Sequence, residues 1–125
     1  VLALVTLATA APAQPTVFPA PDDEAARLLI YSSLDTRLAA IVIAAFQDRN
    51  PGVTVAYEDL LTGQIAARVE DESAGGQTAD LVFLSAMDLA VKLANDGYAR
   101  EVDLPAARDW PRWANWRDTA FAIAV

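Results

Sequence analysis

Hydroxyl-bearing and small residues occur at three points where a predicted strand is followed by a predicted helix. In chain order, the residues at these three turns are Ser32 and Ser33, Thr62 and Gly63, and Ser85 and Ala86. Hydroxyl groups and the free N–H groups of a helix N-terminus donate hydrogen bonds, and the helix dipole adds positive potential. Together they suit an oxyanion or a polar small molecule. The alternative is that these serines and the threonine only cap their helices, which is their commonest role.

The composition excludes several kinds of chemistry at these turns. The 125 residues include no histidine and no cysteine, which removes His-dependent triads, thiolate zinc sites and disulfides. Nucleophile-elbow, Walker and dinucleotide-binding motifs are also absent from the sequence. The net charge of −8 disfavours a nucleic-acid surface. We therefore predict a protein that is not an enzyme, uses no cofactor and binds no nucleic acid.

The third turn lies in the segment with the clearest pattern. Residues 81–84 form a short apolar run, which predicts a strand buried on both faces. Ser85 and Asp88 have the spacing of a capping box, and Asp88 and Lys92 have that of an ion pair along a helix. Gly97 suits the end of this helix. Its predicted inner face consists of Met87, Ala90, Val91 and Ala94.

Two earlier segments repeat the order of strand and helix. A predicted strand at 28–31 precedes a helix that ends at Asn50-Pro51-Gly52. A second strand at 53–57 precedes a helix from Thr62 to about Ser73. The predicted inner faces are Leu38, Ile41, Val42, Ala45 and Phe46 in the first helix, and Ile65, Ala66 and Val69 in the second.

Charged and aromatic residues outside the turns have simpler interpretations. Arg68 and Glu72 are spaced for an outward ion pair, and the acids at 58–59 and 70–72 predict a solvated face. The three tryptophans within 110–116 favour packing of apolar surface over a platform for sugar stacking. Tyr31 is expected to be half-buried at a strand end, with contact to a ligand left open.

Strands alternate with helices along residues 27–125, and a last strand is predicted at 119–125. This order predicts an α/β fold with a mainly parallel sheet and helices beside it. The carboxyl ends of parallel strands share one edge of the sheet. The three turns should therefore gather at that edge, where open α/β sheets bind their ligands.

The first part of the chain predicts export. Residues 1–13 are apolar and uncharged, and they end in Ala11-Pro12-Ala13, a small-x-small cleavage pattern. The apolar run is shorter than the ~20 residues that a bilayer requires. We interpret 1–13 as part of a signal peptide, with a buried N-terminal element as the alternative. The proline-rich residues 14–26 predict an exported linker without regular structure.

Several stretches resemble the N-terminal part of bacterial extracellular solute-binding proteins. The similarity is to the ferric-iron type of ABC-transporter substrate-binding protein. The stretches are Leu29-Ile30-Tyr31-Ser32-Ser33, Ala45-Phe46 with Asn50-Pro51-Gly52-Val53-Thr54-Val55, Thr78-Ala79-Asp80-Leu81-Val82, Ser85-Ala86-Met87-Asp88-Leu89, Asn95-Asp96-Gly97-Tyr98-Ala99 and Trp113-Ala114-Asn115-Trp116-Arg117-Asp118.

The resemblance implies a periplasmic receptor of the type II binding-protein fold, in which two α/β lobes close on a ligand and present it to the membrane permease of an ABC importer. Residues 27–125 would be the N-terminal part of the first lobe, with the second lobe missing. The ligand-binding residues that the resemblance carries over are Ser32, Ser33, Thr62, Gly63, Ser85 and Ala86. The alternative is a receptor that presents its ligand to a sensor-kinase ectodomain.

Two departures from the family leave the ligand open. Leu84 stands where relatives often have the first serine of a Ser-Ser pair. The paired tyrosines that bind iron in the family lie in its C-terminal part, so the resemblance assigns no metal ligand to this chain. The expected ligand is ferric iron or an organic or phosphorylated anion.

Overall fold

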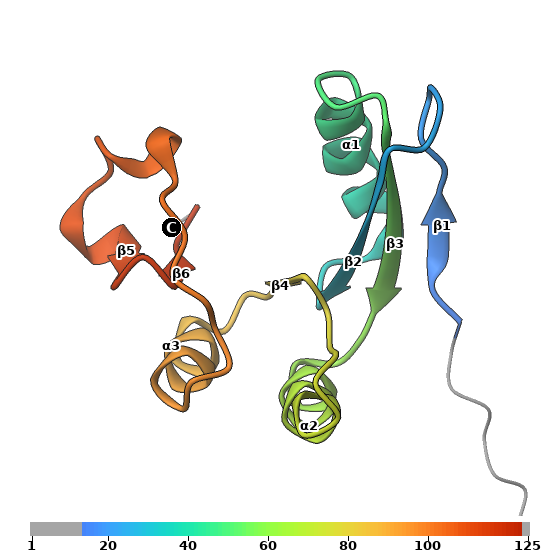
Figure 1. Cartoon of the computed structure of the whole chain (residues 1–125). Coiled ribbons are helices and arrows are strands. Elements are labelled where there is room, and N and C mark those ends of the chain that lie inside the picture. The colour runs from blue at the N-terminus through green and yellow to red at the C-terminus, as the bar shows by residue number, and fades with distance from the viewer. Residues whose placement is uncertain (1–13, 124–125) are drawn as a thin grey trace, which may run out of the picture.

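A four-stranded sheet forms the centre of the fold, and the computed structural model describes residues 14–123 (Figure 1). The strands lie in the order β1-β3-β2-β4. Strand β2 is parallel to both β3 and β4, while β1 is antiparallel to β3. The predicted α/β fold with a mainly parallel sheet is therefore confirmed. The strand bounds are Thr16–Phe18 for β1, Ala26–Ser32 for β2, Val53–Asp59 for β3 and Leu81–Phe83 for β4.

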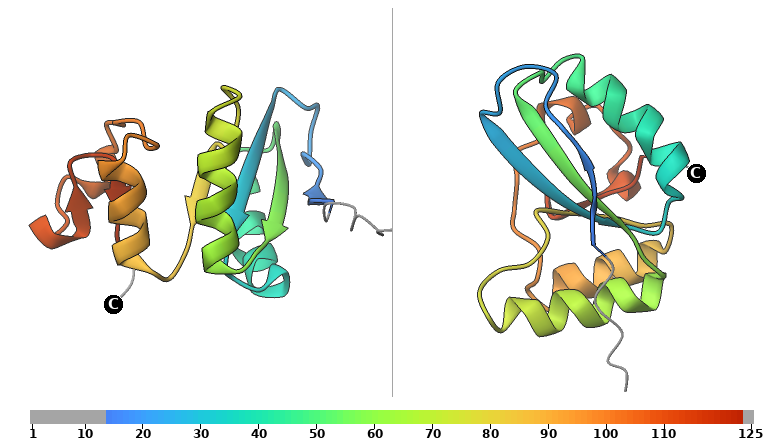
Figure 2. Two further views of the ribbon diagram at one scale, coloured as in Figure 1. Left: turned by 90° about the horizontal axis from the view of Figure 1, so that it is seen from below. Right: turned by 90° about the vertical axis from the view of Figure 1, so that its right-hand side faces the viewer.

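Helices cover both faces of this sheet (Figure 2). Helix α1, Thr36–Gln47, packs on the face that carries Ile30 and Val55. Helices α2, Thr62–Ser73, and α3, Met87–Asn95, pack on the face that carries Leu29 and Tyr31. Successive residues of β2 thus point to opposite layers, as the pleat of a strand requires.

The predicted inner face of α1 is wrong. The residues assigned to it are exposed, with Ile41 at 70%, Val42 at 61% and Leu38 at 55%. The helix instead buries Ala39, Ile43 and Gln47. Apolar residues surround most of this helix, so their periodicity does not select one face. The remaining residues of the predicted face, Ala45 and Phe46, are also exposed.

Gln47 helps to fix this orientation of α1. Its side-chain amide donates to the carbonyl oxygens of Phe18 and Pro19 at 3.1 Å and of Val53 at 2.9 Å. These bonds join the end of α1 to β1 and β3 and give a buried amide its partners. Phe18 belongs to β1. Residues 14–26 were predicted to have no regular structure, and the presence of β1 shows that this prediction is wrong. The prolines beside β1 are tolerated because it is an edge strand.

The predicted solvated acidic face is wrong for Glu58, which is only 5% exposed. Arg68 of α2 forms a bidentate ion pair with this carboxylate. The same guanidinium donates to Glu72 at 2.7 Å and lies 4.5 Å from the ring centre of Tyr31. The Arg68–Glu72 ion pair predicted from the spacing is present, but it does not point only outward. Both side chains are about 30% exposed, and they also bind Glu58 of β3 and Tyr31 of β2.

Helix α3 differs from its prediction at the start and agrees with it at the end. Its N-cap is Ala86 and no side chain caps it, so the predicted capping box at Ser85 is wrong. Lys92 pairs with Asp96 at 2.5 Å rather than with Asp88. At the C-terminus, Gly97 has a φ of 88°, as a left-handed C′ residue does.

The predicted burial of α3 and β4 needs a similar correction. Leu93 is the buried residue of α3, while Met87 on its predicted inner face is 37% exposed. Strand β4 is not buried on both faces, because it lies at the edge of the described sheet and Leu81 is 48% exposed.

The C-terminal part forms a small unit outside the main sheet. Residues Asn115–Trp116 form β5 and Ala120–Phe121 form β6, and the two strands pair in an antiparallel hairpin. The strand predicted at 119–125 is therefore short and belongs to this hairpin rather than to the parallel sheet. Short 3₁₀ turns at Pro105–Ala107 and Arg112–Ala114 precede it.

The tryptophans of this unit have different environments. Trp110 packs edge-on against Phe121, with ring centres 6.4 Å apart, and Trp116 donates to the Asn95 side chain at 3.1 Å. These contacts support the packing interpretation for two of the three rings. Trp113 is 59% exposed.

The leader predicted at residues 1–13 lies outside the described residues. Among the helices of residues 14–123, none has the length and apolar character needed to cross a membrane.

Candidate functional site

The sheet brings the three predicted turns together at its carboxyl edge. The end of β2 lies between the ends of β3 and β4. The N–H of Leu60 donates to the Ser32 carbonyl at 2.8 Å, and the N–H of Ser33 donates to the Phe83 carbonyl at 3.2 Å. The N–H of Ser85 reaches the Ser33 hydroxyl oxygen at 3.4 Å. The turn after β2 is therefore the centre of the edge.

Ser32 is the one predicted site residue that is fully buried, with 0% of its surface exposed. Its hydroxyl oxygen accepts from the N–H of Leu34 at 3.0 Å, which closes the turn between β2 and α1. A ligand at this edge does not reach that hydroxyl unless the turn moves. The Ser32 hydroxyl therefore helps to position the turn, while Ser33 and Thr62 are partly exposed and Ser85 is exposed.

The N-terminus of α1 is already occupied by carboxylates. Asp35 accepts from the N–H of Arg37 at 2.9 Å, and Asp59 accepts from the N–H of Thr36 at 3.3 Å. The hydrogen bond from the Arg37 N–H and the nearby guanidinium hold the pKa of Asp35 below its usual value. An anionic ligand would therefore find acids rather than free donors at this helix.

The N-termini of α2 and α3 are more open. Among the described residues, none accepts a hydrogen bond from the N–H of Thr62 or Gly63. Ala86, the N-cap of α3, has no side-chain acceptor for the first turn of that helix. Gly63 also has free space where a Cβ would lie. These two helices supply the donors that remain for a ligand.

Tyr31 does not face this edge. It is 1% exposed, and its hydroxyl donates to Glu72 at 2.8 Å beneath α2. Burial first, and then the bond to Glu72, raise the pKa of Tyr31 to about 12. Tyr31 therefore belongs to the interior network around Arg68 and does not contact a ligand at the edge.

Sequence reasoning missed the two acids at α1. Asp59 lies two residues after the predicted strand at 53–57, so its position at the carboxyl edge was visible in the sequence. Asp35 is the N-cap of α1, and its side chain accepts from the N–H of Arg37. Both acids restrict which ligands the edge accepts.

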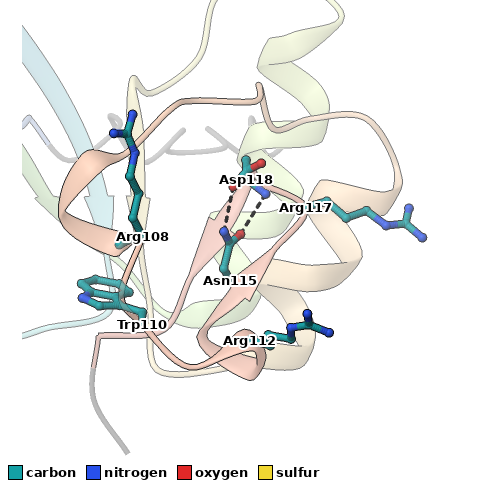
Figure 3. A pocket seen from close by; sticks show the side chains of 7 residues that line it. Arg108, Trp110, Arg112, Asn115, Arg117 and Asp118 are labelled. Carbon is teal, nitrogen blue, oxygen red and sulfur yellow. Dashed lines mark hydrogen bonds between the residues drawn. The ribbon is translucent and has the colours of Figure 1, made fainter.

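Two hollows lie elsewhere on the described residues. One, of about 270 Å³, is in the C-terminal unit (Figure 3), where Asn115 and Asp118 exchange two hydrogen bonds. In Figure 3 the guanidinium group of Arg108 points away from those of Arg112 and Arg117, so the three do not converge on one anion site. The other is an open hollow beside Pro21 and Gly52.

The described residues contain no group of three or more acidic, histidine or cysteine side chains arranged to hold a metal ion. The groups at the carboxyl edge are hydroxyls, backbone N–H donors and the carboxylates of Asp35 and Asp59. The hydroxyls and N–H groups can donate hydrogen bonds to an anion, and the two carboxylates can accept hydrogen bonds.

Comparison with known proteins finds similarity to solved structures. No family model matches the chain, and no curated protein does. The crystal structure of the substrate binding protein of the ABC transporter from Agrobacterium tumefaciens is similar, with 51% identity and a TM-score of 0.81. The match covers 91% of this chain and 34% of that one, so this chain spans about a third of that protein's length. The match to a transporter's substrate-binding protein supports the prediction that this chain is not an enzyme.

Proposed function

We propose that this chain is part of a solute-binding receptor that delivers a small ligand to the membrane permease of an ABC importer. The observation that carries the proposal is its 51% identity to the substrate-binding protein from Agrobacterium tumefaciens. Within the proposal, residues 27–125 are the N-terminal part of a first, type II lobe. A second lobe covers the ligand from the other side of the carboxyl edge.

The ligand that fits this edge best is an organic or phosphorylated anion. Ser33, Ser85 and the free N–H groups at Thr62 and Gly63 are donors, and donors at helix N-termini favour negative oxygens. Bare ferric iron fits less well, because the described residues hold no group of three or more acidic side chains arranged around a metal ion. Iron that arrives with its own anion, such as ferric citrate, is compatible with the donors.

Replacing Ser85 by alanine is expected to weaken binding roughly 5- to 30-fold, which corresponds to a lost hydrogen bond of about 1–2 kcal/mol. Titration calorimetry of the intact receptor with inorganic phosphate, a phosphosugar and ferric citrate measures the effect. Ser73→Ala is the matched control, because Ser73 ends α2 at the opposite edge of the sheet. Equal affinities of wild type and Ser85→Ala for every ligand that binds would contradict the site.

Export to the periplasm is part of the same proposal. The apolar residues 1–13 and Ala11-Pro12-Ala13 motivate it. Expression in a bacterial host with a periplasm should yield a mature protein that begins at Gln14 in the periplasmic fraction. N-terminal sequencing of the fractionated protein checks this. A product that keeps the leader and stays in the cytoplasm would contradict export.

A further inference from the structure

A network of charged and hydroxyl groups lies directly behind the carboxyl edge. Tyr31 of β2 and Glu58 of β3 are partners in the register of the sheet, and the next register pair, Ser32 and Asp59, ends the two strands. Arg68 of α2 binds the Glu58 carboxylate with two guanidinium nitrogens, and its guanidinium carbon lies 4.5 Å from the centre of the Tyr31 ring. The network therefore lies one residue inside the edge.

A second acid of α2 extends this network toward β4. The Glu72 carboxylate accepts from Arg68 at 2.7 Å and from the Tyr31 hydroxyl at 2.8 Å. It also accepts from the Thr78 hydroxyl at 3.1 Å, three residues before β4 begins at Leu81. Arg68 and Glu72 thus connect α2 to the ends of β2 and β3 and to the segment that leads into β4.

Folding stability alone does not require charges at this place. Glu58 is 5% exposed, and apolar side chains of similar volume often replace a buried ion pair without loss of stability. Apolar contacts are not directional, whereas a bidentate ion pair sets both the distance and the angle between the elements that it joins. The buried side-chain nitrogen and oxygen atoms of the described residues all have hydrogen-bond partners, and such a satisfied network is rigid.

The start of α2 is the part of the edge that depends most on this rigidity. Its first turn carries Thr62 and Gly63, and its N-cap, Leu61, is apolar and 73% exposed. Ile65 and Val69 pack α2 on the sheet, but their contacts are apolar. The ion pair of Arg68, less than two turns from Thr62, is the directional contact that fixes the helix on the strand ends.

We propose that Arg68 is a positioning residue of the binding site, because its bidentate pair with Glu58 fixes the first turn of α2 relative to the ends of β2 and β3. Arg68 acts through the backbone around Thr62 and Gly63 rather than by contact with a ligand. The inference rests on the proposed function, since it concerns the same edge.

The double variant Glu58→Leu/Arg68→Met tests this proposal. It removes both charges of the buried pair and leaves Glu72 as the acceptor for Tyr31 and Thr78. Because no unpaired charge stays buried, its melting temperature is expected to remain near the wild-type value. A role in stability alone would then leave the edge unchanged, whereas a positioning role would loosen it.

Hydrogen exchange of the ligand-free protein, followed by NMR spectroscopy, measures this loosening. The N–H of Leu60 donates to the Ser32 carbonyl at 2.8 Å and joins the ends of β3 and β2. In the double variant it is expected to exchange roughly tenfold faster relative to the N–H of Ala56, a buried residue inside β3. The ratio of the two rates isolates the edge, because global unfolding accelerates both.

Ligand affinity is the second measurement. Titration calorimetry of the intact receptor uses inorganic phosphate, a phosphosugar and ferric citrate, and the double variant is expected to bind about tenfold more weakly whichever of them binds the wild type. If none binds the wild type, the proposed anionic ligand is wrong, and the exchange ratio still decides the role of Arg68.

Ile43→Ala is the matched control, because Ile43 is a buried residue of α1 on the other face of the sheet. It should lower the melting temperature but leave the exchange ratio and the affinity unchanged. A wild-type exchange ratio in the double variant overturns the proposal, and so does an equal rise of the ratio in Ile43→Ala. If the double variant does not fold, Arg68→Lys replaces it. Lysine keeps the charge without the bidentate fork, so a wild-type ratio in Arg68→Lys also overturns the proposal.

Discussion

Arg68→Met is expected to lower the free energy of unfolding by roughly 3 kcal/mol, the scale of breaking a buried ion pair by removing one partner. Glu58 would keep its charge in a position that is 5% exposed, without the bidentate guanidinium that now binds it. Methionine keeps much of the apolar contact with Tyr31, so the loss of unfolding free energy measures mainly the missing charge interaction with Glu58. Chemical denaturation at neutral pH measures the difference.

Arg108→Met is the matched control for Arg68→Met. Arg108 pairs with Asp103 at 2.9 Å, but both side chains are more than half exposed. Solvent screening makes such pairs weak, so the change should stay within about 0.5 kcal/mol. Equal losses for the two variants would show that the network around Arg68 contributes no more than a surface ion pair.

The same network predicts how stability depends on pH. Burial raises the pKa of Glu72, but hydrogen bonds from Arg68, Tyr31 and Thr78 outweigh it and leave that pKa below its usual value. Its contribution is therefore present above pH 4.5, the unfolded value, and is lost as the pH falls through the lower folded pKa. The contribution of Tyr31 is present below pH 10 and is lost by about pH 12. Arg68→Met should flatten the acid side of this profile.

Ile65→Ala is expected to cost roughly 3 kcal/mol, within the range for removing a large aliphatic side chain from a core. Ile65 is 0% exposed and packs with Tyr31, Val69 and Leu93 between α2, α3 and the sheet. Denaturant unfolding measures the loss.

Ile41→Ala makes the same chemical change on a different helix and serves as the control. Ile41 is 70% exposed on the outer side of α1, so its truncation should cost less than about 0.5 kcal/mol. Similar losses for Ile41→Ala and Ile65→Ala would mean that α1 packs on the sheet through the face predicted from its sequence. The contrast therefore tests the orientation of this helix.

Much of the fold could be predicted because its signals are local. The helix from Thr62 to Ser73 has one apolar stripe and one polar side, so its bounds and its inner residues Ile65 and Val69 follow from spacing alone. Gly97 ends α3 because a left-handed C′ residue favours glycine. The order of strands and helices also predicts where the three turns gather, since parallel strands end at one edge.

Long-range contacts decided the rest. Which side of α1 faces the sheet depends on Gln47 reaching carbonyls of β1 and β3 at 2.9–3.1 Å, and no spacing within α1 encodes those partners. Glu58 is buried because Arg68 lies over it, although a run of acids ordinarily predicts solvent exposure.

The candidate site shows the same division. Its residue types and its place at the carboxyl edge follow from the sequence, but accessibility is set by how the turn after β2 closes. Ser32 is drawn inside by the N–H of Leu34, while Ser33 stays near the surface and meets Ser85. Two adjacent serines are chemically identical in the sequence, and only the tertiary structure buries the hydroxyl of one and leaves the other partly exposed at the carboxyl edge.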